Sequence, residues 1–329
     1  MNVHEFPGLS TVFNRDDERP SRSSLALGGL SAMLEDPAVS EIFVIGTRMS
    51  LERHGSIADV GGPMSEEAVL DLAFQLATAG GRELSIAQPY QTVSLDGLRI
   101  ALTIPPYSHT PTISIRRHKS VPVDEDFLLA QRTLTPEACS WLKSLAHSRR
   151  SFVVTGAAGA GKTTLLRWLV SQMPGDERIV LVEEVRELAL ESVHAHVVSL
   201  ETRPPNKEGR YGISVRDALR HALHLRPDRI GVGELRGEES LEWLLGLMTG
   251  HLGSFSTLHA ASARDAYARL AWLAHTASPS VSPADFERAF LAEIPVVCHM
   301  KRSDGRRYLA EALEGGHPVI LSGMPGATS

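Results

Sequence analysis

The chain has 329 residues, of which 43% are hydrophobic and 22% are charged, and its formal net charge is −6 at pH 7. This hydrophobic content is enough for sizeable cores and excludes a disordered chain, and the length suggests two domains. An acidic balance argues against a protein that binds nucleic acid through bulk positive charge, so we expect no stable nucleic-acid binding. Cys139 and Cys298 have neither metal-site nor disulfide spacing. Two buried cysteines in a reducing compartment are the simplest interpretation.

Residues 1–24 are polar and lack the apolar core of a signal peptide, so we expect a flexible tail and a cytoplasmic protein. No uninterrupted apolar run approaches the about 20 residues that cross a bilayer. Membrane contact is therefore expected to be peripheral.

Residues 25–118 are expected to form a small α+β domain, beginning with leucines at helical spacing that end at Asp36-Pro37. A short strand is expected at residues 41–45. Ser65 is placed to cap a second helix that ends at Gly80-Gly81. The predicted inward face of that helix contains Ala68, Leu72 and Leu76.

The second half of this domain shows short alternating runs from residue 91 to residue 117, which indicate strands. Asp96-Gly97 interrupts them and is typical of a hairpin turn. Residues 119–132 carry prolines and acids, and we expect a linker there that acts as a hinge.

Residues 133–329 are expected to form an α/β domain. Thr135-Pro136-Glu137 is typical of a helix start. Short, strongly apolar strands then alternate with helices, as in a parallel sheet that is covered on both faces. The predicted strands are residues 152–155, 179–182, 230–232, 254–258 and 296–300. A helix is expected near residues 285–291, and a turn at Asp304-Gly305.

Residues 156–163 read Gly-Ala-Ala-Gly-Ala-Gly-Lys-Thr and match the P-loop pattern in full, between a predicted strand and a predicted amphipathic helix. Such a loop aims backbone N–H groups and a helix N-terminus at phosphates, and glycine permits the close approach. Lys162 is expected to reach the outer phosphates, and the Thr163 hydroxyl to bind Mg²⁺. The expected nucleotide-binding residues of this segment are Gly156, Gly159, Ala160, Gly161, Lys162, Thr163 and Thr164.

Acids follow two of the predicted strands. Glu183 and Glu184 end one, and Glu234 follows another. Because ligands lie at the carboxyl ends of parallel strands, these glutamates are candidates to hold Mg²⁺ or the attacking water. His259 ends a third strand and is a candidate sensor of the phosphates, whereas His251 is a weaker candidate.

Four segments together resemble one family, the ATPases of type II and type IV secretion systems and of pilus assembly and retraction. The P-loop resembles the family's Walker A box. Residues 178–188 resemble its acidic box, with Glu184 where Asp is more common. Residues 225–237 resemble its Walker B box, which ends in Gly-Glu, and residues 249–260 its histidine box. Residues 200–206 and 214–217 look like the branch that powers tight-adherence (Flp) pili, and the four-cysteine insert of many type II motors is absent.

The resemblance implies a RecA-like ATPase domain behind a smaller N-terminal α+β domain, assembly into a homohexamer, and an inner-membrane platform protein as partner. It implies ATP and Mg²⁺ as cofactors, with Thr163 and Glu234 near the metal. We favour Glu234 as general base, with Glu183 supporting the water or metal and His259 reporting loss of the γ-phosphate. Arginines of such proteins contact the nucleotide from the N-terminal domain or from the next subunit. The candidates here are Arg99, Arg116, Arg203 and Arg216.

Three alternatives share parts of this pattern. A conjugation-type motor for DNA or effector transfer has the same catalytic segments. A regulatory module could bind ATP without turning it over, but the intact Lys162, Thr163, Glu183 and Glu234 argue against it. A RecA-like DNA-processing ATPase is disfavoured by the N-terminal pattern and by the acidic balance.

Overall fold

The structure is a computed structural model that describes residues 30–36, 38–53, 56–62, 64–95, 97–117, 123–203, 205 and 210–321. The chain divides into two compact units, Met1–Ser120 and Val121–Ser329. The predicted tail, 1–24, lies outside the described residues, as do residues 119–122 of the predicted linker.

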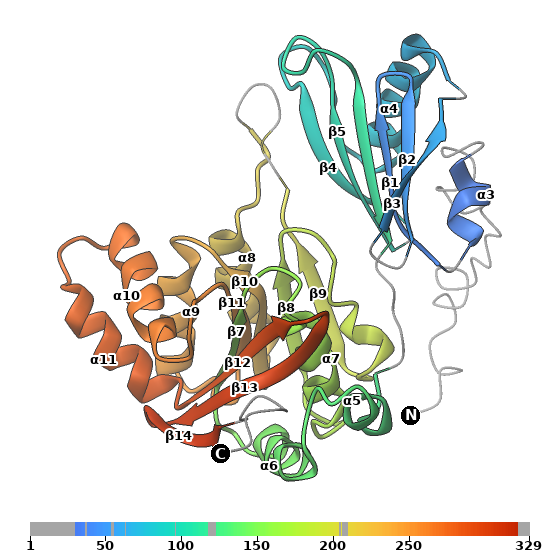
Figure 1. The fold of residues 1–329 in the computed structure, drawn as a ribbon. Coiled ribbons are helices and arrows are strands. Elements are labelled where there is room, and N and C mark those ends of the chain that lie inside the picture. Colours follow the sequence, from blue (N-terminus) through green and yellow to red (C-terminus); the bar gives the residue numbers. More distant parts are fainter. Residues whose placement is uncertain are drawn as a thin grey trace, which may run out of the picture. The chain divides into compact units, whose positions relative to one another are not determined.

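The first unit is a six-stranded antiparallel sheet in the order β3-β2-β1-β6-β5-β4, with a helix packed against it (Figure 1). Alternate strand residues, such as Ile42, Ile100 and Ile113, face a common core. The predicted hairpin joins β4 to β5, although Asp96 itself is not among the described residues. The elements are α3 (Leu30–Glu35), β1 (Val39–Ile45), β2 (Arg48–Arg53), β3 (Ser56–Gly61), α4 (Glu66–Ala79), β4 (Tyr90–Leu95), β5 (Leu98–Thr103) and β6 (Thr112–Arg117).

Helix α4 begins where its cap predicts. The Ser65 side chain accepts a hydrogen bond from the backbone N–H of Ala68, and Glu66 and Glu67 occupy the first turn. The inward face is Val69, Leu72, Ala73, Leu76 and Ala77. The prediction that Ala68 faces inward is wrong: it is exposed, because the buried stripe begins one residue later.

The segment expected to be a linker contains a helix, α5 (Glu125–Ala130), which the side chain of Asp124 caps. Leu128 is fully buried in the core of the second unit. The expectation of a hinge is therefore wrong for residues 125–130, because a capped helix with a buried anchor cannot absorb the rotation. Helix α6 (Pro136–His147) follows and is capped by Thr135, as predicted.

The second unit is an eight-stranded sheet in the order β14-β13-β12-β7-β11-β10-β8-β9. Strands β12, β7, β11, β10, β8 and β9 are parallel, and two further strands extend the sheet beyond β12: β13 pairs antiparallel with β12, and β14 pairs antiparallel with β13 (Figure 1). The strands are β7 (Phe152–Gly156), β8 (Ile179–Glu183), β9 (Val197–Glu201), β10 (Arg229–Leu235), β11 (Phe255–Leu258), β12 (Val296–Ser303), β13 (Arg306–Glu314) and β14 (His317–Leu321).

Helices cover both faces of this sheet. Phe152 and Val154 face a core shared with α5, α6 and α7, whereas Val153, between them, faces a core shared with α8, α9, α10 and α11. The predicted parallel sheet, buried on both sides, is confirmed. The remaining helices are α7 (Lys162–Ser171), η2 (Leu190–Ser192), α8 (Val215–Ala222), η3 (Leu223–Leu225), α9 (Glu239–Met248), α10 (Asp265–Ala277) and α11 (Pro283–Glu293).

Candidate functional site

The P-loop connects β7 to α7 and has the backbone of an anion cradle. Gly156, Gly159 and Gly161 have φ values of +145°, +70° and +98°, a region that side chains rarely adopt. A Cβ on Gly156 would come 2.4 Å from the carbonyl oxygen of Met300. All three positions therefore require glycine for their conformation, and Gly156 requires it for space as well. Ala160, between Gly159 and Gly161, is buried.

Lys162, the first residue of α7, folds back over this loop. Its side chain is buried, and Nζ donates to the carbonyl oxygens of Gly156 at 3.0 Å and Ala157 at 3.1 Å. Burial lowers the pKa of the Lys162 ammonium. The lysine is thus held where an incoming phosphate can replace weak carbonyl contacts with a charged partner.

Glu234, at the carboxyl end of β10, lies in a cluster of charged groups beside Lys162. Its Oε2 accepts a hydrogen bond from Nε of Arg236 at 2.8 Å. Its Oε1 lies 2.7 Å from Nε2 of His259, a close contact without the angles of a directed hydrogen bond. Nζ of Lys162 is 3.4 Å from both ring nitrogens of His259. The ends of three neighbouring strands therefore converge on the P-loop.

Glu183 occupies a different environment at the end of β8. It is 5% exposed, and its Oε1 accepts hydrogen bonds from the backbone N–H groups of Glu187 at 3.1 Å and Leu188 at 2.9 Å. Burial outweighs these hydrogen bonds and raises the pKa of the Glu183 carboxyl to about 7. The other oxygen, Oε2, is buried without a partner among the described residues.

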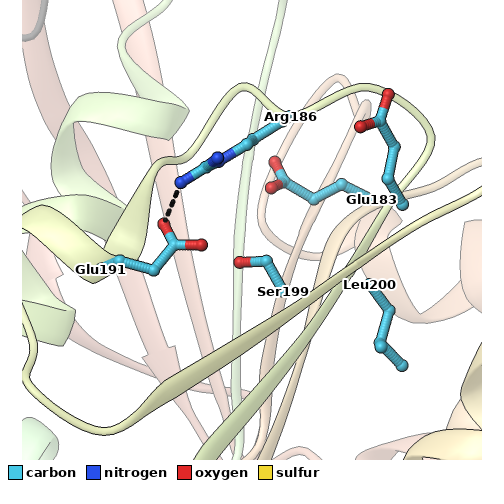
Figure 2. Close-up of a pocket in the computed structure, with 6 residues that line it drawn as sticks. Glu183, Arg186, Glu191, Ser199 and Leu200 are labelled. Atoms are coloured by element: carbon cyan, nitrogen blue, oxygen red, sulfur yellow. Dashed lines mark ion pairs between the residues drawn. The ribbon is translucent and has the colours of Figure 1, made fainter. Parts of the chain in front are cut away.

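A cavity of about 200 Å³ lies against Glu183 on the side of the edge strand β9. Figure 2 shows Arg186 turned toward Glu191 at this cavity, with Ser199 facing them. Neither Lys162 nor Glu234 lines it. Glu183 still approaches the Walker B segment, because a Cβ on Gly233 would come 3.0 Å from its Cγ. The structure thus places Glu183 one strand away from the Lys162–Glu234 cluster.

The two remaining residues of the predicted loop site lie on the first turn of α7. Thr163 is exposed and Thr164 is half-buried. A hydroxyl that is exposed on this turn is free to act as an oxygen ligand for a hard cation. Within the described residues, no group of three acidic, histidine or cysteine side chains could hold a metal ion by itself.

The candidate arginines of the first unit lie directly opposite each other, Arg99 on β5 and Arg116 on β6. Nε of Arg116 is 3.2 Å from a carboxylate oxygen of Glu41, and Arg99 also has an interaction partner. Like charges at opposed strand positions repel. This pairing suits a face that receives an anion.

The candidate arginines of the second unit are engaged locally. Nε of Arg203 donates to the carbonyl oxygen of Tyr211 at 2.8 Å. Arg216 forms ion pairs with Glu242 at 2.6 Å and Glu238 at 3.4 Å. Arg216 must break these pairs to reach another subunit, so its role across an interface stays a prediction.

Several polar residues near the P-loop were not selected from the sequence. Arg236 bridges Glu234 and Glu184, at 2.9 Å from the latter. Its position two residues after Gly233-Glu234 is the sequence feature that could have identified it. His299 is buried next to β7, with Nδ1 2.8 Å from Oγ1 of Thr155. No local pattern in the sequence marks His299.

His251, the weaker histidine candidate of the sequence analysis, lies at the other end of β11 from His259. Its ring contacts the carbonyl oxygen of Gly246 there.

None of the helices in the described ranges is both long and apolar enough to span a bilayer. This agrees with the absence of a spanning run in the sequence.

Comparison with known proteins shows what the chain resembles. A family model for "Type II/IV secretion system protein" matches residues 91–294. A Mycobacterium tuberculosis protein, provisionally named for conjugal transfer, is 38% identical over 255 residues, covering 75% of this chain and 71% of that protein. The type IV secretion system protein PtlH of Bordetella pertussis is 32% identical over 243 residues, covering 67% of this chain and 71% of PtlH. The solved structure of the pilus retraction motor PilT with bound ADP has a TM-score of 0.63 at 19% identity and covers 90% of this chain and 83% of that one, which shows a shared fold.

Proposed function

The chain belongs to the family of type II/IV secretion system proteins, and on that premise we propose how this secretion ATPase binds its nucleotide and what it drives. We propose that the chain assembles as a homohexamer at the inner face of the cytoplasmic membrane. The ring transmits the work of ATP hydrolysis through an inner-membrane platform protein of a pilus or secretion machine. The observation that carries the nucleotide site is the convergence of Lys162, His259 and Glu234 at one edge of the sheet, whereas the ring and its membrane partner are proposed from the family resemblance.

ATP binds with its phosphates on Gly159 to Thr164. The backbone N–H groups of the loop and the N-terminus of α7 face the phosphate chain, and Lys162 exchanges its two carbonyl contacts for the γ-phosphate. The exposed Thr163 hydroxyl and the Glu234 carboxylate supply oxygen ligands of the kind Mg²⁺ prefers. Bound there, Mg²⁺ would neutralise charge on the phosphates.

Glu234 is our candidate for the general base, since it shares a cluster with Lys162 and is positioned by Arg236. His259, between Glu234 and Lys162, senses the phosphate because it touches both groups that would respond to it. Glu183 has a pKa of about 7, which also suits proton transfer near neutral pH. Its contact with Gly233 and its distance from Lys162 favour a supporting role.

Arg99, Arg116, Arg203 and Arg216 remain the candidates for contacts from the N-terminal domain or from a neighbouring subunit. The register of β5 and β6 supports this proposal, because it places Arg99 and Arg116 opposite each other and therefore on the same face of the sheet. An arginine that meets the γ-phosphate in the transition state accelerates related reactions by about 10³–10⁵-fold.

A conjugation-type motor is the second candidate function. The specific support is the naming of two relatives, one for conjugal transfer and one for type IV secretion. The tight-adherence assignment rests on residues 200–206 and 214–217 alone, and part of the first segment lies outside the described residues. Identification of the membrane protein that co-purifies with the ATPase would separate a pilus platform from a conjugation channel.

The nucleotide site is tested by Lys162→Ala, with Lys143→Ala as a control. Lys143 lies on α6, is half-buried and forms an ion pair with Glu125. Loss of the lysine removes charge stabilisation at the γ-phosphate, and we expect phosphate release to fall by about 10²–10³-fold with an unchanged melting temperature. The control should retain full turnover. Normal hydrolysis by Lys162→Ala would refute the site.

The choice of base is tested by comparing Glu234→Gln with Glu183→Gln in single-turnover hydrolysis. We expect Glu234→Gln to bind ATP but to abolish the chemical step, and Glu183→Gln to retain part of it. The reverse order would assign the base to Glu183.

The ring is tested by light scattering with and without nucleotide, and by mixing two inactive variants. If an arginine acts across the interface, Glu234→Gln and Arg203→Ala subunits should regain activity when mixed, because some interfaces then contain both native groups. A strict monomer with full specific activity at every concentration would rule the ring out.

A further inference from the structure

The β12–β13 hairpin runs past the P-loop and carries four cations near its tip. Strand β12 pairs with β7 as far as Met300 opposite Gly156, so residues 301–303 extend beyond the start of the loop (Figure 1). Within the hairpin, Arg302 lies directly opposite Arg307. Lys301 and Arg306 belong to the alternate positions of the same strands and therefore to the opposite face.

The Arg302–Arg307 face of the hairpin is turned toward the P-loop. Nε of Arg307 donates a hydrogen bond to the carbonyl oxygen of Gly159 at 2.8 Å. A Cβ on Gly161 would lie 3.3 Å from Cδ of Arg307, and a Cβ on Gly159 would lie 3.7 Å from a terminal nitrogen of Arg302. A side chain at either of the two glycines that shape the loop would therefore touch one of these arginines.

Neither arginine has an acidic partner in the part of the chain that the structure describes. Both are exposed, and their opposed positions bring like charges together. Arg307 uses only Nε for the loop, so the remaining N–H groups of its fork are available to another acceptor. An anion bound beside the P-loop at this face would be a partner for both guanidinium groups.

We propose that Arg302 and Arg307 form a second phosphate-binding element, contributed by the same subunit, on the P-loop. Arg302 is the contact for the phosphate chain of the bound nucleotide, and Arg307 is a positioning residue that fixes the loop through the Gly159 carbonyl. The inference rests on the proposed function, since the ligand is the nucleotide of that site. It adds to the single charge of Lys162 the guanidinium group of Arg302 as a second contact for the polyphosphate, on a loop that Arg307 holds in place.

The test compares Arg302→Gln and Arg307→Gln with Arg306→Gln, which removes the same charge from the opposite face of the same hairpin. Dissociation constants for ADP and for adenosine are measured by calorimetry on the full chain. We expect the first two variants to bind ADP about tenfold more weakly, with adenosine binding unchanged. Arg306→Gln should match the wild type for both ligands. Weaker binding of adenosine as well would indicate general damage and would overturn a phosphate contact.

The conservative variants separate charge from position. Arg302→Lys should restore most of the affinity for ADP, whereas Arg307→Lys should bind ADP as weakly as Arg307→Gln, because a lysine lacks the Nε–H that holds Gly159. ADP affinities of Arg302→Gln and Arg307→Gln equal to that of Arg306→Gln would overturn the inference while leaving the ATPase proposal intact. A wild-type chain that binds no nucleotide would overturn both.

Discussion

The buried carboxyl of Glu183 makes stability depend on pH in a direction that can be measured. Burial raises its pKa from 4.5 to about 7, so folding takes up a proton between these values. Below pH 4.5 the carboxyl is protonated in both states and costs nothing. As the pH rises toward 7, the carboxyl ionises in the unfolded chain but stays protonated in the folded protein. Ionisation therefore stabilises the unfolded chain, and the free energy of unfolding falls.

The magnitude follows from the size of the shift. A change from 4.5 to about 7, at about 1.4 kcal/mol per pH unit, amounts to about 3 kcal/mol above pH 7 and about 1 kcal/mol at pH 5. Glu183→Gln keeps an oxygen that can accept from the N–H groups of Glu187 and Leu188, but removes the titration. We therefore expect the difference in the free energy of unfolding between Glu183→Gln and the wild type to shift by about 2 kcal/mol in favour of the variant when the pH rises from 5 to 8.

The assay is the melting temperature of both proteins at pH 5 and pH 8 without nucleotide. For a domain of this size, about 2 kcal/mol corresponds to about 4–8 °C. Glu184→Gln, at the exposed neighbouring position, is the control for loss of a carboxylate in the same assay. An offset between Glu183→Gln and the wild type that is the same at both pH values would refute the reasoning.

Three further predictions concern the core and the cluster. Arg229→Ala should lower the free energy of unfolding by about 3–5 kcal/mol in denaturant titration, since it removes a fully buried side chain, leaves the carbonyl oxygens of Ala146 and Gly253 without their donor, and takes away one of two arginine partners of Glu177. Gly231→Ala should cost about 1–3 kcal/mol in the same assay, because its Cβ would meet the Phe255 ring at 2.6 Å. His259→Gln should lower kcat while leaving the ADP dissociation constant within about twofold, and an equal loss in both would argue against a sensor.

Local chemistry made several features predictable from the sequence. The P-loop is contiguous, and its glycines, lysine and threonine act through neighbouring backbone, so the segment needs no distant partner to be recognised. The starts of α4 and α6 follow from the side chains of Ser65 and Thr135, which cap the N–H groups three residues later. The apolar strands of the second unit identified a sheet covered on both faces.

Other features depended on where the elements lie in the sheet. The face of α4 that meets the sheet decided that Ala68 points outward, and a buried site for Leu128 decided that the expected linker contains a helix. Glu183 and Glu234 were equal candidates by position, each at a strand end. The preference for Glu234 as base was a hypothesis of the sequence analysis. The structure adds their environments: Glu183 accepts from the N–H groups of its own loop, and Glu234 lies beside His259, which in turn lies beside Lys162.

Arg302 and Arg307 are the clearest example of residues whose place in the site could not be predicted from the sequence. Sequence alone placed them near a turn, remote from the P-loop by well over a hundred positions. The parallel register of β12 on β7 brings the hairpin to Gly159. Sequence determined what each segment can bind, because that chemistry is local. The tertiary structure decided which groups meet, because strand order and register are set by burial of both sheet faces and by pairing between distant strands.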